Sequence, residues 1–255
     1  MWKRKKIKDT VAIILAAGVS KRMKTDTPKV LHEVCGRPML SFVLDACRAA
    51  GIEKIYVVVG FGADKVKRIF ANERGIVWVN QAEQKGTGHA VLCCKEHLKG
   101  FEGRTFVVCG DGPLIRPQVL RSLLEKCNGS TSAVLATARL DKPAGYGRIE
   151  RDEDGNLERI VEDKDCTNEQ LKIKEVNPSY YLFDNKVLFD SLEQVTNDNV
   201  QKEYYLTDVF EIMLKAGRKV AVIEAVRPQE AMSVNTKQEL EKLNEIMKER
   251  MQGNC

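Results

Sequence analysis

Short apolar runs alternate with segments whose apolar residues recur at helical spacing, and this order continues from residue 11 to residue 139. Strands are predicted at 11–17, 54–59, 76–79, 105–109 and 133–139, and helices at 38–50, 64–71, 88–98 and 117–127. Strands that are apolar on both faces have to be covered on both faces. The order therefore predicts an α/β fold, with a Rossmann-like, mixed but mostly parallel sheet and helices on both sides.

A less regular pattern follows residue 145. The turn sequence Asp154-Gly155-Asn156 predicts a hairpin of strands 147–150 and 157–161. Further strands are predicted at 173–183 and 219–226, and helices at 205–216 and 236–251. We interpret residues 10–255 as one domain, with a nucleotide-binding half to about residue 115 and a more irregular half after it. Residues 1–9 form a basic tail.

The composition is that of an ordinary folded protein, since 43% of the 255 residues are hydrophobic and 30% are charged. No apolar run approaches the roughly 18 residues that a membrane-spanning helix needs, so no membrane contact is expected. The net charge is +5, and five basic side chains with Asp9 put +4 of it in residues 1–9. The rest of the chain is nearly neutral, so no nucleic-acid partner is expected, although the tail alone could touch nucleic acid or acidic lipid.

Eight cysteines occur, and none forms a Cys-x-x-Cys pair. Most lie in apolar patterns, which favours reduced thiols that fill the core over disulfides or a zinc site. Reduced thiols are typical of the cytoplasm. The basic start lacks a long apolar run and a cleavage site, so no signal peptide is predicted and the expected location is cytoplasmic.

Two loops near the start could bind phosphate. Small residues follow the first strand at 15–18, where backbone N–H groups can approach a ligand closely, and Lys21 and Arg22 follow with positive charge. Ligands of parallel sheets bind at the carboxyl ends of the strands. Lys29, held by Pro28, could reach the same place, or it could be a solvated surface lysine. Neither the GxGxxG nor the P-loop pattern is present, which disfavours a Rossmann-type oxidoreductase.

The segment 81–90 joins a strand to a helix. The amide of Gln81 suits the edge of a base, and the N–H groups of Gly86 and Thr87 at a helix start are free for an anion or a carbonyl. The alternative is an ordinary helix start with Thr87 as the N-cap. His32 and His89 could suggest catalysis, but no third group in the sequence orients either ring, so we interpret both as structural or solvated.

A carboxylate follows the strand 105–109. Asp111 lies between Gly110 and Gly112, at the carboxyl end of a predicted central strand, where Mg²⁺ beside phosphates would find a hard oxygen ligand. The alternative is an ordinary turn aspartate.

These motifs, in this order and spacing, resemble one family. The chain is similar to the uridyltransferase part of bacterial N-acetylglucosamine-1-phosphate uridyltransferases, which are sugar nucleotidyltransferases. The likeness runs from about residue 10 to residue 250. It rests on LAAG…KRM at 15–23, PKVLH at 28–32, QAEQKGTGHAV at 81–91, GDGPL at 110–114, GYGRI at 145–149, VEDKDCT at 161–167, KEVN at 174–177, EYYLTD at 203–208 and SVN at 233–235.

The resemblance implies the nucleotide-diphospho-sugar transferase fold. It also implies transfer of UMP from UTP to N-acetylglucosamine-1-phosphate, with Mg²⁺ as cofactor. Its implied catalytic residues are Arg22 and Lys29, and its implied metal ligands are Asp111 and Asn235. The implied nucleotide-binding residues are Leu15, Ala16, Ala17, Gly18, Gln81, Gly86, Thr87 and Gly110. The implied sugar-binding residues are Gly147, Glu162 and Asn177, which makes the second half the sugar-binding half.

The sequence departs from the family at Asn177, which is followed by Pro178-Ser179 where Thr-Gly is usual. Proline removes a backbone N–H and restricts Asn177 to extended conformations, so we expect a smaller preference for N-acetylglucosamine-1-phosphate. A nucleotidyltransferase for another sugar phosphate and a non-catalytic sugar-nucleotide sensor stay open as alternatives. No hexapeptide-repeat domain follows residue 255, so we expect no acetyltransferase activity.

Overall fold

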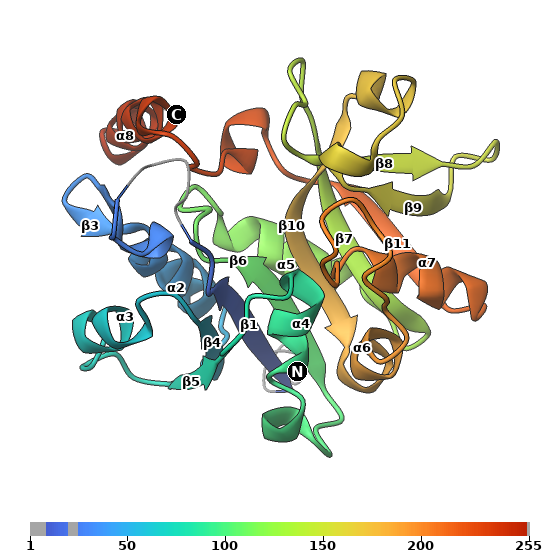
Figure 1. The fold of residues 1–255 in the computed structure, drawn as a ribbon, viewed down its shortest axis with the longest axis horizontal. Helices are drawn as coiled ribbons and strands as arrows, with labels where there is room; N and C mark the ends of the chain where they lie inside the picture. Colours follow the sequence, from blue (N-terminus) through green and yellow to red (C-terminus); the bar gives the residue numbers. More distant parts are fainter. Residues whose placement is uncertain (1–8, 20–24, 254–255) are drawn as a thin grey trace.

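Parallel strands form the first half of the sheet in the computed structural model, which describes residues 9–19 and 25–253 (Figure 1). Four strands lie in the order β6-β1-β4-β5 and pair in parallel. They are β1 (Thr10–Ala16), β4 (Ile55–Val59), β5 (Ile76–Asn80) and β6 (Arg104–Cys109). The predicted α/β fold is confirmed. Arg22 and nearly all of the predicted basic tail lie outside the described residues.

One reversed strand continues this sheet into the second half. β10 (Glu175–Asp184) lies between β6 and β7 (Thr131–Arg139) and is antiparallel to both, and β11 (Lys219–Glu224) pairs in parallel with β7. The predicted hairpin is present as β8 (Gly147–Arg151) and β9 (Leu157–Val161), and β8 pairs with the start of β10. The sheet is therefore mixed and mostly parallel, as predicted.

Helices cover both faces of the sheet (Figure 1). Alternate residues of β1 face opposite layers: Ala12 and Ile14 pack toward one face, and Val11 and Ile13 pack toward the other. The first face is covered by α2 (Met39–Ala49), α3 (Ala63–Ile69) and α5 (Pro117–Lys126). The second is covered by α4 (Thr87–Leu92), α6 (Asn185–Leu192) and α7 (Asp208–Lys215). No helix in the described ranges is long and apolar enough to cross a membrane.

The last helix has a small core of its own. α8 (Lys237–Met251) packs on the ribbon of β2 (Glu33–Val34) and β3 (Arg37–Pro38). Its N-terminus has a capping box, in which Thr236 accepts from the Glu239 N–H and the Glu239 carboxylate accepts from the Thr236 N–H. This cap fixes the chain that enters α8.

The helices of the structure differ from the prediction at three places. The helix predicted at 88–98 divides into α4 and a 3₁₀ turn (Glu96–Leu98), because the N–H groups of Cys94 and Lys95 bond to carbonyls three residues back, at 2.9 and 3.0 Å. α6 was not predicted, although Asp184 caps it by accepting from the Val187 N–H. The helix predicted from residue 205 begins only at Asp208. The seven described cysteines are free thiols, as predicted.

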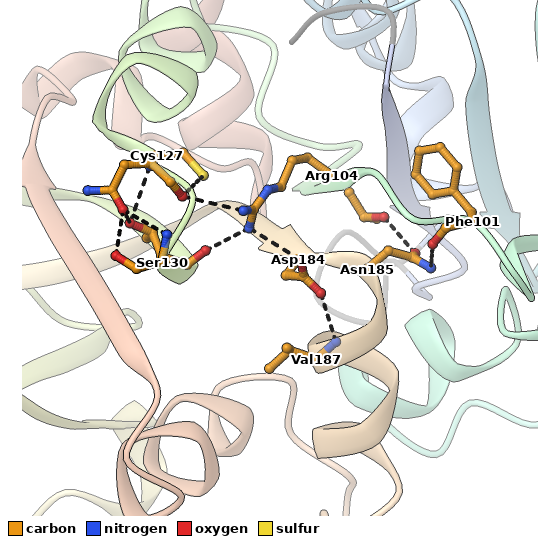
Figure 2. Close-up of polar contacts among 10 residues, drawn as sticks. Phe101, Arg104, Cys127, Ser130, Asp184, Asn185 and Val187 are labelled. Carbon is orange, nitrogen blue, oxygen red and sulfur yellow. Dashed lines mark hydrogen bonds and ion pairs between the residues drawn. The ribbon is translucent and has the colours of Figure 1, made fainter.

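A polar cluster fixes the edge of the sheet at the start of β6 and the end of β10 (Figure 2). Asn185 is 4% exposed, accepts from the Thr105 hydroxyl at 2.8 Å, and donates to the carbonyls of Leu98 and Phe101. Arg104 donates to the Thr131 carbonyl at 2.7 Å. These contacts join the loop before β6, β6 itself and the start of α6.

We expect Asn185→Ala to lower the free energy of unfolding by roughly 3 kcal/mol, because it removes three hydrogen bonds and leaves the buried Thr105 hydroxyl without its acceptor. Lys186→Ala, an exposed substitution on the same helix, should change it by less than about 0.5 kcal/mol. Urea unfolding of both variants measures the difference. Equal stability of the two variants would contradict a structural role for the Asn185 contacts.

Candidate active site

Four parallel strands, β1, β4, β5 and β6, have their carboxyl ends at the same edge of the sheet. The loops that follow these strands therefore lie together there. Gly110 follows β6 and donates its N–H to the Leu15 carbonyl at 2.9 Å. A Cβ at Gly110 would lie 3.1 Å from that carbonyl oxygen and from Val30. Glycine at this position therefore lets the loop after β6 lie tightly against the end of β1. At Gly18, just after β1, a Cβ would meet no atom of the described residues within 4 Å.

Lys29, Asp111 and Asn235 meet at this edge from three distant parts of the chain. The Lys29 ammonium forms an ion pair with the Asp111 carboxylate and donates to Asn235 Oδ1 at 2.8 Å. Both ion-pair side chains are largely shielded from solvent, at 19% and 16% exposed. The structure thus brings together one predicted phosphate-binding cation and both predicted metal ligands.

Local structure positions each of the three residues. Lys29 begins a 3₁₀ turn (Lys29–Leu31) directly after Pro28, which packs on Gly62 so closely that a Cβ there would lie 2.4 Å from the proline ring. Asp111 directly follows β6. Asn235 stands just before the capping box of α8 and donates its N–H to the Glu239 carboxylate at 2.6 Å.

Oxygen ligands for a cation are few at this site. Within residues 9–19 and 25–253, no group of three or more His, Cys, Asp or Glu side chains could hold a metal ion. One carboxylate and one amide oxygen, from Asp111 and Asn235, already share the Lys29 ammonium. This donor set fits a hard cation that takes its remaining ligands from phosphate and water, as Mg²⁺ does.

The segment 85–88 is clamped by the segment 204–206. Gly88 donates its N–H to the Tyr204 carbonyl at 2.8 Å, and Tyr204 donates its N–H to the Lys85 carbonyl at 2.8 Å. Gly86 has φ +109°, and a Cβ there would lie 2.6 Å from the Tyr204 carbonyl oxygen. This contact explains why residue 86 has to be glycine. The clamp also explains why α7 begins at Asp208 and not at residue 205, as predicted.

Thr87 does not cap α4. The N-cap is Gly86, and the Thr87 hydroxyl instead accepts from the Leu206 N–H at 3.0 Å. The alternative interpretation of Thr87 as the N-cap was therefore wrong, because the tertiary contact takes the hydroxyl. The side chain of Gln81 is 3% exposed, and its Nε2 lies 3.1 Å from the Gly86 carbonyl oxygen and 3.0 Å from His89 Nδ1.

The three predicted sugar-binding residues line one cleft. Asp111 lines the same cleft, so the ion pair and the predicted sugar site adjoin. Gly147 in β8 pairs in register with Asn177 in β10. Glu162 also lines a smaller neighbouring cavity, which Leu15 and Thr87 reach from the nucleotide-binding half. The predicted nucleotide and sugar residues thus border adjacent spaces.

A bulge in β10 forms one wall of this cleft. The register against β7 shifts between Val176 and Tyr180, and Ser179 adopts φ +65°. Asn177 is 5% exposed; its Oδ1 accepts from the Ser179 N–H at 3.0 Å and its Nδ2 donates to the Tyr181 hydroxyl at 2.6 Å. The Asn177 amide is therefore held in one orientation before any ligand binds.

Acidic side chains gather beside Glu162. The Glu162 carboxylate accepts from the Thr207 hydroxyl at 2.9 Å, and burial raises the pKa of Glu162. Burial and the charge of Glu162 raise the pKa of Asp208 to about 6. This wall of the cleft favours a ligand that donates hydrogen bonds, such as a sugar hydroxyl.

Sequence reasoning missed three residues that shape the site. His89 contacts Gln81, Thr207 contacts Glu162, and Ser179 contacts Asn177. Thr207 lies in EYYLTD and Ser179 follows Pro178, so the motifs marked both neighbourhoods. His89 was considered, but its partner Gln81 lies eight residues earlier in the chain. The turn that brings the two side chains together is visible only in the structure.

Comparisons with known proteins found relatives over most of the chain. A family model described as "MobA-like NTP transferase domain" matches residues 12–210. The "Bifunctional protein GlmU" of Clostridium tetani is 45% identical over 242 residues, and that of Alkaliphilus metalliredigens is 44% identical over 241. Each match covers 94% of this chain, and the chain spans about half the length of these relatives, 52%.

A solved structure shows the same fold. It is a UDP-glucose pyrophosphorylase complexed with UDP-glucose, with a TM-score of 0.75 over 94% of this chain and 99% of that chain. The sequence identity is 16%. The likeness therefore supports the predicted nucleotide-diphospho-sugar transferase fold.

We expect Gly86→Ala to cost at least about 1 kcal/mol more stability than Gly100→Ala. Both glycines have positive φ, but a Cβ at Gly100 would meet no described atom within 4 Å, whereas one at Gly86 would strike the Tyr204 backbone. Thermal and urea unfolding of the two variants compare the costs. Similar costs would mean that the clamp yields to the added methyl group.

We expect Asp208→Asn to stabilise the protein at pH 8 and to flatten its stability between about pH 4 and pH 6. The pKa of Asp208 in the folded state, about 6, lies above the usual aspartate value, so the folded state binds the extra proton in this range. The free energy of unfolding of the wild type therefore falls as the pH rises through this range. Urea unfolding at pH 5 and pH 8 measures this, with Asp198→Asn, at an exposed carboxylate, as the control. An unchanged pH dependence in Asp208→Asn would contradict the raised pKa.

Proposed function

The chain belongs to the MobA-like NTP transferase family, and from this premise we propose that it transfers UMP from UTP to N-acetylglucosamine-1-phosphate, giving UDP-N-acetylglucosamine and pyrophosphate. The resemblance of its motifs to the bacterial uridyltransferases supports the two substrates. The GlmU relatives, at 44–45% identity over most of this chain, support the same class of reaction.

The meeting of Lys29, Asp111 and Asn235 is the observation that carries the proposal. Residues 29 and 235 are 206 positions apart, yet their side chains are hydrogen-bonded beside the cleft lined by Asp111, Gly147, Glu162 and Asn177. A phosphate-binding cation, two hard oxygen ligands and a polar cleft are what uridylyl transfer to a sugar phosphate requires.

The reaction needs positioning and charge neutralisation more than proton transfer. An oxygen of the sugar phosphate forms a bond to the α-phosphorus of UTP in line, and the bond to the pyrophosphate oxygen breaks. The attacking oxygen is already anionic, so no general base is required. Aligning two polyanions and neutralising the charge that develops are the tasks left to the protein.

Lys29 and Arg22 are the cations proposed for this task. An ammonium has three N–H donors, and Asp111 and Asn235 use two of those of Lys29, so one is left for a phosphate oxygen. Mg²⁺, held by Asp111 and Asn235, would neutralise phosphate charge. These two oxygens leave room in its coordination shell for phosphates and water.

The base and the sugar are proposed to bind on the two sides of Glu162. Gln81, Gly86 and Thr87 would hold the uracil, and residues 15–18 with Gly110 would hold the nucleotide phosphates and ribose. The Asn177 amide keeps one hydrogen after its bond to Tyr181, and this hydrogen is available to a sugar hydroxyl. Glu162 would accept from the sugar. The free thiols of the chain suit the proposed cytoplasmic location.

Pyrophosphate release from UTP with Mg²⁺ and each candidate sugar-1-phosphate tests the proposal. Release with N-acetylglucosamine-1-phosphate should be faster than with glucose-1-phosphate, and omission of Mg²⁺ should abolish it. Equal rates with the two sugars would remove the substrate assignment. Binding of UTP without turnover of any sugar phosphate would favour the sensor alternative.

We expect Lys29→Ala to lower turnover by roughly 100–1000-fold, as loss of a donor to developing charge does in oxyanion-type sites. The Lys29 contacts also hold Asn235 beside Asp111, so thermal unfolding has to show that the variant is folded. Lys186→Ala, at an exposed lysine paired with Asp190, is the matched control and should keep wild-type turnover. Wild-type kinetics in Lys29→Ala would move phosphate binding away from this side chain.

A further inference from the structure

The Gln81 side chain is held at its amide nitrogen by two neighbours. Gln81 directly follows β5, and its Nε2 lies 3.1 Å from the Gly86 carbonyl oxygen and 3.0 Å from His89 Nδ1. Gln81 is 3% exposed, and His89 is in the first turn of α4. The two contacts come from the loop and the helix that directly follow β5.

The Gly86 carbonyl decides which way the amide faces. A carbonyl oxygen only accepts, so the Gln81 atom beside it has to be the NH₂ group and not the amide oxygen. The same NH₂ group faces His89 Nδ1. That nitrogen therefore has to accept, which puts the ring proton of a neutral His89 on Nε2.

The opposite end of the amide is left free. Among the described residues, the hydrogen bonds of the Gln81 side chain are made by Nε2, and none donates to Oε1, so this oxygen is available to a ligand. An oxygen in a fixed place can only accept. It will pair with an N–H on a base and not with a ring nitrogen lone pair.

We propose that His89 is a positioning residue that fixes the Gln81 amide with its oxygen toward the nucleobase, and that it thereby selects uracil over cytosine. Uracil presents the N3–H donor, whereas cytosine presents an N3 lone pair. The inference deepens the proposed function, because it rests on Gln81 as the residue that meets the base. His89 itself does not touch the nucleotide.

The Gly86 contact alone leaves one Gln81 hydrogen unpaired. Without an acceptor at position 89, the amide can rotate away from Gly86 and present its NH₂ group outward, where it would suit the cytosine N3. A site built to pair with one polar group rejects the analogue that lacks it, because a buried group is left unpaired. Loss of His89 should therefore weaken discrimination more than it weakens catalysis.

The test compares UTP with CTP in the intact chain. His89→Leu should lower the UTP-to-CTP ratio of kcat/KM by roughly 10-fold, mainly through a higher KM for UTP. His89→Asn, whose side-chain oxygen can accept from Gln81, should restore most of the ratio. His97→Asn, at an exposed histidine beside Tyr56, is the matched control and should leave the ratio unchanged.

A double substitution isolates the pathway through Gln81. In a Gln81→Leu background, His89→Leu should cause no further loss of selectivity, because the group it positions is gone. A wild-type ratio in His89→Leu would overturn the proposal. So would an equal fall of kcat with both triphosphates in folded His89→Leu, which would show a general structural role.

Nucleotide binding separates this inference from the proposed reaction. If the wild type releases no pyrophosphate with any sugar phosphate, the proposed function fails. Calorimetric titration with UTP and CTP then still tests His89. Tighter binding of UTP, lost in His89→Leu and kept in His89→Asn, supports the positioning role. Equal affinity for the two triphosphates in the wild type overturns it.

Discussion

The antiparallel pairing of β10 with β6 determines where the candidate site forms. Tyr180 pairs with Val108, so the start of β10 lies beside the end of β6. The bulge at Asn177 and Ser179 therefore forms a wall next to Asp111, and β8 is held against the same segment. A shift of this register would carry the polar start of β10 away from the carboxylate and would separate the two halves of the site.

The electrostatics of the site are balanced within the protein itself. Asp111 is largely shielded from water, and a shielded carboxylate needs a partner. Lys29 supplies the charge and Asn235 supplies a neutral oxygen. Glu162 and Asp208 form no ion pair with another described residue, and burial raises the pKa of both. One wall of the site is thus neutralised by an ion pair, and the other has carboxyl groups with raised pKa values.

The sequence predicted most of the sheet, because continuous apolar runs and the Asp-Gly-Asn turn are local signals. It did not predict that β10 would insert between β6 and β7, because the residues of a strand do not specify which strands it pairs with. The late start of α7 depends on the clamp between 204–206 and 85–88, which is a tertiary contact. The helix and strand propensities of the residues could not have predicted either the position of β10 or the start of α7.

The site residues were predicted from motifs, and their contacts were not. Lys29 was predicted to bind phosphate and Asp111 and Asn235 to bind the metal, and the structure adds that one ammonium joins all three. His89 was dismissed because the sequence shows no partner for it, whereas the turn after β5 brings Gln81 within hydrogen-bond distance. Some roles depend on which atom of an amide faces inward. Such roles can be predicted only from the folded structure.

The long separation of Lys29 from Asn235 has a consequence for the newly made chain. Domains begin to fold while synthesis is still in progress, starting from the N-terminal side. The segments that hold Lys29 and Asp111 are made more than a hundred residues before Asn235. Asn235, carried by the segment before α8, is made only after all the strands of the sheet. The parallel half of the sheet can thus be in place well before the last oxygen of the site joins it.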